Sequence, residues 1–176
     1  METRLPSLAW ALLFTSALPA AAAAPPNSAG QLIAFTAAGL DGDGFGGIWL
    51  VRPDGTGFKQ LTSFANPIFE LDDLHGLQLP EDHPTVSPNG KQIAFVSNRG
   101  HAFNKELYLM DVNGANVRRL TDSPGLDTEP SWSPDGGKIA FSSARFGGLD
   151  ICILDLTNLA VTRITTNPFE DVEPGQ

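Results

Sequence analysis

The stretch that decides the fold is Pro130-Ser-Trp-Ser-Pro-Asp-Gly-Gly-Lys-Ile-Ala-Phe141. A near-copy, Pro84-Thr-Val-Ser-Pro-Asn-Gly-Lys-Gln-Ile-Ala-Phe95, stands 46 residues earlier (130 − 84 and 139 − 93). In both, a Ser-Pro-Asx-Gly quartet predicts a type I turn, because Pro sets φ at the second position and Gly tolerates the strained fourth. A strand is expected on each side of the turn, so the chain is built from repeated β units.

A third unit is marked by Ile33-Ala34-Phe35, which matches the Ile-Ala-Phe triplets at 93–95 and 139–141. Apolar residues on both faces of such a strand indicate that it is sandwiched between neighbouring sheets. The pairs Asp54-Gly55 and Asn113-Gly114 predict hairpin turns. The next strand, residues 117–121, carries two arginines and is expected to face solvent.

Each unit therefore predicts a four-stranded meander that runs from apolar inner strands to a polar outer strand. That gradient is typical of a β-propeller blade. The alternative, an ordinary β-sandwich, predicts two-faced alternation and no repeat of this period. The expected fold class is all-β, an incomplete propeller of about three blades.

Together these motifs resemble the TolB-type propeller repeat over most of residues 31–176. The shared features are the Pro-x-x-Ser-Pro-Asp-Gly turn, the Ile-Ala-Phe strand, Ser97-x-Arg99, Ser143-x-Arg145, Asp111-x-Asn113-Gly114 and the Leu120-Thr121 end. The resemblance implies a six-bladed propeller, often a periplasmic scaffold of the Tol-Pal envelope system. Similar repeats precede the hydrolase domain of prolyl-oligopeptidase-like enzymes, so the resemblance indicates architecture better than role.

The repeats predict blade 1 at residues 31–79, blade 2 at 80–126, blade 3 at 127–170 and the start of a fourth at 171–176. The first unit lacks its leading strand, which suits a blade completed by a strand from the C-terminus. Three blades leave two faces uncovered. We therefore expect either a truncated propeller or the pairing of two half-propellers into six blades.

The N-terminus has the pattern of a secretory signal peptide over residues 1–24, followed by a linker at 25–30. Arg4 precedes an apolar run, residues 8–18, that is too short to span a bilayer. Alanines at 20–24 offer cleavage sites, and no cysteine stands there to carry a lipid. We expect a periplasmic or secreted protein without stable membrane insertion.

The composition of the chain limits the kinds of partner that it can bind. A net charge of −9 disfavours a nucleic-acid groove, which needs clustered Lys and Arg.

The single cysteine, Cys152, cannot form an internal disulfide and is expected in the core. The sequence Asp41-Gly-Asp-Gly44 resembles the start of a calcium loop, but Phe45 replaces the third ligand, which favours a Gly-rich hairpin. No metal or cofactor is expected.

Three equivalent strand-entry residues, His83, Glu129 and Glu173, are expected to ring one mouth of the propeller channel. They are the candidate ligand-binding residues, for a metal or a cationic ligand. The alternative is that they only satisfy backbone donors between blades.

About thirteen extra residues are inserted around residues 70–80, since 23 residues separate Leu61 from Pro84 (84 − 61) against 10 from Leu120 to Pro130 (130 − 120). This insertion is either the partner-contacting element or a loop that caps a blade. The candidate partner-binding residues are Phe69, Leu71, Asp72, Asp73 and Leu74.

The chain has no G-x-S-x-G nucleophile motif, so no catalytic residue is predicted. The expected function is a non-catalytic envelope scaffold that binds a protein partner, a ligand or a second half-propeller. The alternative is a propeller fragment of a larger enzyme, either a prolyl-oligopeptidase-like peptidase or a metal-dependent lyase.

Overall fold

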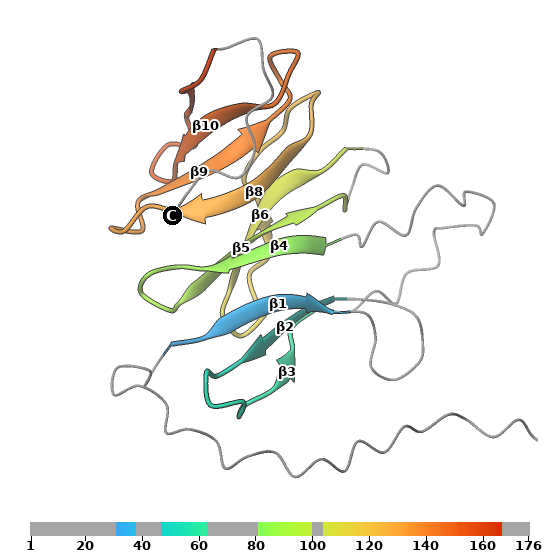
Figure 1. Ribbon diagram of the computed structural model, residues 1–176, viewed down its shortest axis with the longest axis vertical. Helices are drawn as coiled ribbons and strands as arrows, with labels where there is room; N and C mark the ends of the chain where they lie inside the picture. Colours follow the sequence, from blue (N-terminus) through green and yellow to red (C-terminus); the bar gives the residue numbers. More distant parts are fainter. Residues whose placement is uncertain (1–30, 38–46, 63–80, 100–103, 167–176) are drawn as a thin grey trace, which may run out of the picture.

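The computed structural model describes residues 31–37, 47–62, 81–99 and 104–166. Every regular element in these ranges is a β-strand, and the strands form three antiparallel sheets. The sheets stack one upon another along the long axis of the molecule (Figure 1). This arrangement confirms the predicted all-β class and the incomplete propeller of about three blades.

Blade 1 has three strands in the described residues, β1 (Ile33–Ala37), β2 (Gly47–Val51) and β3 (Lys59–Gln60), in the order β1-β2-β3. The register pairs Phe35 with Trp49 across β1 and β2. The Ile-Ala-Phe triplet thus lies on the strand nearest the centre, with no inner strand beside it in the part described.

Blade 2 is a complete four-stranded meander. Its strands are β4 (Glu81–Val86), β5 (Gln92–Ser97), β6 (Glu106–Asp111) and β7 (Arg118–Arg119), hydrogen-bonded in chain order. Phe95 pairs with Tyr108, as Phe35 pairs with Trp49 in blade 1.

Blade 3 repeats blade 2 with β8 (Asp127–Trp132), β9 (Lys138–Ser143), β10 (Asp150–Asp155) and β11 (Val161–Arg163). Here Phe141 pairs with Cys152. The Phe pairings make Trp49, Tyr108 and Cys152 equivalent, and this correspondence relates the three blades residue by residue.

Two apolar clusters hold the blades together. Between blades 1 and 2, Ile48 and Leu50 pack with Ile93, Phe95 and Tyr108. The second cluster joins blades 2 and 3, with these buried members: Ala94, Val96, Leu107, Leu109, Leu120, Ile139, Phe141, Cys152 and Leu154. Cys152 is fully buried, which confirms its predicted place in the core, and burial raises the pKa of its thiol.

The predicted turns form as expected. The Gly136 amide donates to the Ser133 carbonyl at 2.8 Å, and Gly136 has a φ of 72° that favours glycine. Asp135 reinforces the turn by accepting hydrogen bonds from the Ser133 hydroxyl and the Gly137 amide. These bonds lower the pKa of Asp135.

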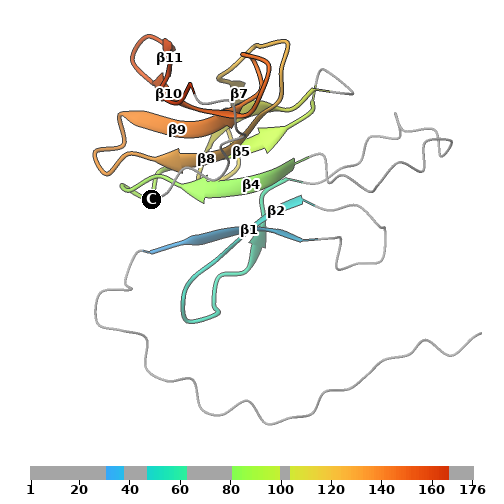
Figure 2. The same ribbon diagram turned by 45° about the horizontal axis from the view of Figure 1, so that its top comes forward.

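The central edge of the stack is formed by β1, β4 and β8, which lie side by side in Figures 1 and 2. Here β4 and β8 are the first strands of their blades, and both begin on the same side of the stack. The strand-entry residues His83 and Glu129 are therefore close enough for their charges to interact.

Candidate functional site

The inner strands β4 and β8 are both bulged at the same point of the repeat. The β4–β5 register shifts between Asp82 and Thr85, and the β8–β9 register shifts between Thr128 and Ser131. A bulge re-aims the side chain that it carries. In these two strands the re-aimed side chains are His83 and Glu129.

His83 and Glu129 both adopt left-handed backbone conformations, with φ values of 47° and 55°. Non-glycine residues rarely do so, because the side chain then crowds the backbone at a cost of about 1–2 kcal/mol. Each residue also precedes a proline. Two adjacent blades thus hold equivalent residues in the same strained conformation.

A polar cluster surrounds His83. Its Nδ1 lies 3.1 Å from Oδ1 of Asp82, and Lys105 donates to the other carboxylate oxygen of Asp82. The hydrogen bond with Asp82 raises the pKa of His83, partial burial opposes the shift, and the charges of Asp82 and Glu129 add to it. Burial acts to raise the pKa of Asp82, but the bonds from His83 and Lys105 outweigh it and the pKa is lowered.

Glu129 is partly buried and is held on its own blade. The Ser142 hydroxyl of β9 donates to Glu129 Oε2 at 3.0 Å. The His83 side chain remains 49% exposed. We call Asp82, His83, Lys105 and Glu129 the inner-strand site.

The structure thus brings together two of the three predicted ligand-binding residues, while their role in binding stays a prediction. Glu173 lies outside the described residues, as do all five of the predicted partner-binding residues: Phe69, Leu71, Asp72, Asp73 and Leu74. In the described ranges no three His, Cys, Asp or Glu side chains converge as metal ligands. The described part also holds no helix long and apolar enough to cross a membrane.

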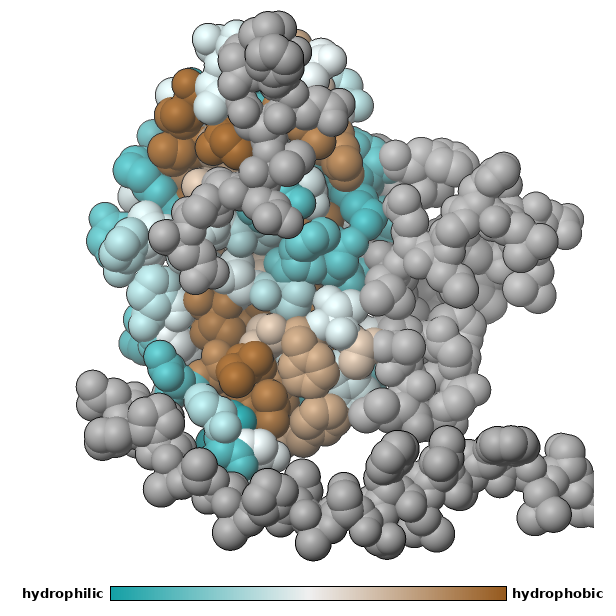
Figure 3. Space-filling view, in the orientation of Figure 1, coloured by the Kyte–Doolittle hydropathy of each residue, from teal (hydrophilic) through white to brown (hydrophobic). Residues whose placement is uncertain are grey.

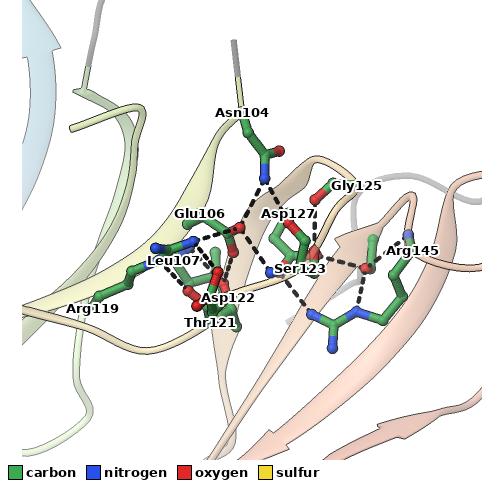
Figure 4. A network of polar contacts seen from close by, with 11 residues as sticks. Asn104, Glu106, Leu107, Arg119, Thr121, Asp122, Ser123, Gly125, Asp127 and Arg145 are labelled. Atoms are coloured by element: carbon green, nitrogen blue, oxygen red, sulfur yellow. Dashed lines mark hydrogen bonds and ion pairs between the residues drawn. The ribbon is translucent and has the colours of Figure 1, made fainter. Parts of the chain in front are cut away.

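Sequence patterns alone do not predict a second polar cluster, which lies between blades 2 and 3 (Figure 4). Glu106 at the start of β6 is buried, and its carboxylate accepts hydrogen bonds from Arg119, Thr121, Asn104 and the Ser123 amide. The sequence predicts that the strand carrying Arg119 faces solvent. That expectation holds for Arg118, but Arg119 reaches back to the buried acid.

A second buried acid, Asp127, lies next to this cluster. It accepts hydrogen bonds from Ser143 Oγ at 2.6 Å and Arg145 Nη2 at 2.7 Å. Blade 2 contains an equivalent of this pair, in which Arg99 is bonded to Glu81. Blade 3 in turn contains an equivalent of the Glu106–Arg119 pair, formed by Asp150 and Arg163. In the sequence, the Ser-x-Arg motifs indicate the arginines of the pairs with Glu81 and Asp127. Which acid each arginine binds can be identified only from the strand register.

A comparison with protein-family models decides the family. Residues 75–175, more than half of the chain, match the TolB beta propeller domain. The chain belongs to the TolB beta-propeller family. This match confirms the resemblance inferred from the repeat motifs.

Individual relatives match over part of this chain and a smaller part of their own length. The TolB homolog of Chlorobium luteolum is 36% identical over 115 residues, which cover 60% of this chain and 26% of that protein. The uncharacterized peptidase YuxL of Bacillus subtilis is 44% identical over 89 residues, or 46% of this chain and 13% of the peptidase.

Among solved structures, TolB from Acinetobacter baumannii superposes with a TM-score of 0.61 at 28% identity, over 80% of this chain and 31% of that one. The chain thus spans less than a third of the length of each of these three proteins. What the whole proteins do is therefore a matter for proposal.

Proposed function

We propose that this chain is an exported, non-catalytic β-propeller scaffold whose inner-strand site binds a protein partner or a small ligand. One observation carries the proposal: His83 and Glu129 occupy equivalent bulges of adjacent inner strands in the same left-handed conformation. Strained backbone of this kind clusters at binding sites, because packing alone does not call for it.

The chemistry of the inner-strand site suits a polar anchor of a partner. His83 offers a half-exposed imidazole held by Asp82, and Glu129 offers a carboxylate that the Ser142 hydroxyl helps to orient. Both groups are fixed on strands of a rigid sheet, so a ligand would bind them without ordering a loop. A backbone amide or an amino group of a partner protein matches these acceptors.

The test is affinity capture from an envelope extract with the wild-type protein and the double variant His83→Ala/Glu129→Ala. We expect a partner retained by the wild type to be lost with the double variant. Asn116→Ala is the matched control, because Asn116 also has positive φ, 55°, but lies in the β6–β7 hairpin of blade 2. Equal capture by all three proteins would refute binding at the inner-strand site.

Export is tested separately. We expect N-terminal sequencing of the protein from the native host to begin near Pro25, after the predicted signal peptide, and fractionation to place it in the periplasm or the medium. An intact N-terminus in the cytoplasmic fraction would contradict export.

The identity with YuxL favours a second candidate, the propeller of a larger peptidase. The scaffold and the peptidase propeller predict different coding sequences downstream of Gln176. A reading frame that continues past Gln176 into a G-x-S-x-G motif would establish the second, because that motif supplies the nucleophile which this chain lacks.

A further inference from the structure

Hydrogen bonds from β8 to blade 2 hold the inner-strand site rigid across the boundary between blades 2 and 3. At the start of β8, the Asp127 amide donates to the backbone carbonyl of Lys105 at 2.9 Å. At the other end of β8, the Trp132 indole Nε1 donates to the backbone carbonyl of Thr85 on β4 at 3.1 Å. The bulge of β8 lies between these two contacts, so the groups that a ligand would meet are fixed before it binds.

Asp82 determines which nitrogen of His83 faces a ligand. Nδ1 of His83 lies 3.1 Å from Oδ1 of Asp82, and Lys105 donates to Oδ2 of the same carboxylate. An ionised carboxylate can only accept hydrogen bonds, so Nδ1 carries a proton. In the neutral ring the lone pair is therefore on Nε2, and this nitrogen is left for a ligand because the His83 side chain is half exposed.

Glu129 supplies a second acceptor from the next blade. The Ser142 hydroxyl donates to its Oε2 at 3.0 Å and orients the carboxylate. A carboxylate has about four acceptor positions, so it can accept a ligand's hydrogen bond in addition to that of Ser142. With a neutral His83, the site thus presents two kinds of acceptor, a ring nitrogen on β4 and a carboxylate on β8.

The charge of the inner-strand site favours a cation. Lys105 balances Asp82, so the carboxylate of Glu129 leaves the four side chains with one net negative charge when His83 is neutral. The neighbouring strand β1 adds no charge, because none of its residues is ionisable. Figure 3 shows hydrophilic side chains gathered over the middle of the molecule, where β4 lies, between apolar areas. The net charge of −9 on the whole chain also attracts a basic partner.

A guanidinium group matches these acceptors best. It is always cationic, and its five N–H donors lie in one plane and point in several directions, so that it can bond to a ring nitrogen and to a carboxylate together. An ammonium group is a more strongly hydrated point charge. A pocket for a small molecule buries most of its ligand, whereas His83 is 49% exposed. The open site therefore suits a side chain presented by a protein.

We propose that the inner-strand site takes an arginine side chain of a protein partner, and that Asp82 selects this side chain by holding the proton on Nδ1 of His83. The guanidinium group donates to Nε2 of His83 and to the carboxylate of Glu129. Asp82 acts through His83 and is a positioning residue. This inference rests on the proposed function, because it names the group of the partner that the scaffold binds.

The first test is the tautomer of His83, measured from the nitrogen NMR shifts of its ring at a pH above the pKa found by titration. We expect the proton on Nδ1 in the wild type, and a shift towards a proton on Nε2 in Asp82→Ala, because the acceptor of Nδ1 is then gone. Asp155→Ala is the matched control, since Asp155 also binds a lysine, Lys138, but lies at the end of β10. A wild-type ring with its proton on Nε2 would overturn the proposal.

The second test is a titration with three acetylated and amidated Gly-Xaa-Gly peptides, in which Xaa is arginine, lysine or citrulline. Citrulline has the shape of arginine without its charge. We expect the arginine peptide to shift the ring resonances of His83 saturably, with an affinity about tenfold above that for the other two, the ratio that one charge-assisted hydrogen bond provides. Equal affinities for the arginine and citrulline peptides, or no saturable shift with arginine, would refute the arginine contact.

Variants locate the binding. Glu129→Gln keeps the shape of the side chain but removes its charge, and we expect it to weaken the arginine peptide about tenfold, as should Asp82→Ala. Asp155→Ala should bind as the wild type does. Wild-type affinity in Glu129→Gln would exclude the carboxylate as a contact, and in Asp82→Ala it would exclude selection by the tautomer. Circular dichroism checks the fold of each variant, and the measurements on the wild type need no variant.

The outcomes separate this inference from the proposed function. A partner captured through His83 and Glu129 should be displaced by the arginine peptide and not by the citrulline peptide. A captured partner that the arginine peptide does not displace would refute the arginine contact and leave the scaffold role standing. If the double variant His83→Ala/Glu129→Ala captures as much as the wild type, the proposed function fails, whereas the tautomer and the peptide titrations still decide the chemistry of the site.

Discussion

At the scale of single residues, the buried acid–arginine pairs within the blades are costly groups to bury. Asp127 is fully buried, and burial raises its pKa even though Ser143 and Arg145 act in the opposite direction. A carboxylate in this position is stable only while its partner stays, because an unpaired buried charge is strongly unfavourable.

We therefore expect Arg145→Met to reduce the free energy of unfolding by about 3–5 kcal/mol. The double variant Asp127→Asn/Arg145→Met should recover part of the loss, since a neutral amide has no charge to desolvate. Urea denaturation at one protein concentration measures both, with the exposed Arg118→Met as control. A double variant no more stable than Arg145→Met would contradict this account.

The same pair predicts a pH dependence. Because the folded pKa of Asp127 is raised, the folded state holds its proton more tightly than the unfolded state does. The contribution of Asp127 to the free energy of unfolding is therefore greatest below its pKa in the unfolded chain, 3.8, and declines as the pH rises through its pKa in the folded protein. Removal of Arg145 raises that pKa further, so the stability of Arg145→Met should fall more steeply with pH than that of the wild type. Parallel pH profiles would argue against it.

His83 has a raised pKa for a different reason, its hydrogen bond with Asp82. Stability from this pair is complete below the usual histidine value of 6.5 and is lost as the pH rises through the higher folded pKa. We expect Asp82→Asn to lower the pKa of His83 more than Glu129→Gln does, because Glu129 acts only through its charge. NMR titration of the His83 ring proton measures both shifts, and the reverse order would show that Asp82 is not the main partner.

At the scale of strands and turns, much of the fold is predictable from sequence. The Ile-Ala-Phe triplets fall within β1, β5 and β9, and the Pro-Asx-Gly turns join inner strands to β5 and β9, because turn chemistry and apolar runs are local signals. The bulges at His83 and Glu129 cannot be predicted from the local sequence. They depend on how β4 pairs with β5 and β8 with β9, which a single strand sequence does not show.

The turn between β8 and β9 gives a prediction at this scale. Gly136 has φ 72°, and the nearest atom to an added Cβ is Pro88 Cδ at 3.8 Å, so a methyl group would fit but the backbone would be strained. We expect Gly136→Ala to cost about 1–2 kcal/mol. Gly148→Ala is the control, because Gly148 shows no positive φ and has open space around its Cβ position. Similar melting temperatures for the two variants would mean that the turn relaxes at no cost.

At the scale of the whole molecule, the family and the number of blades follow from sequence, since the repeat is the propeller's own unit. The buried acid–arginine pairs within the blades do not, because they join residues such as Glu106 and Arg119 through strand register. The apolar contacts between blades lie between these cases. Residues such as Ile48 and Leu50 are visibly apolar in the sequence, but only the structure shows that they are buried against Ile93 and Phe95 of the next blade.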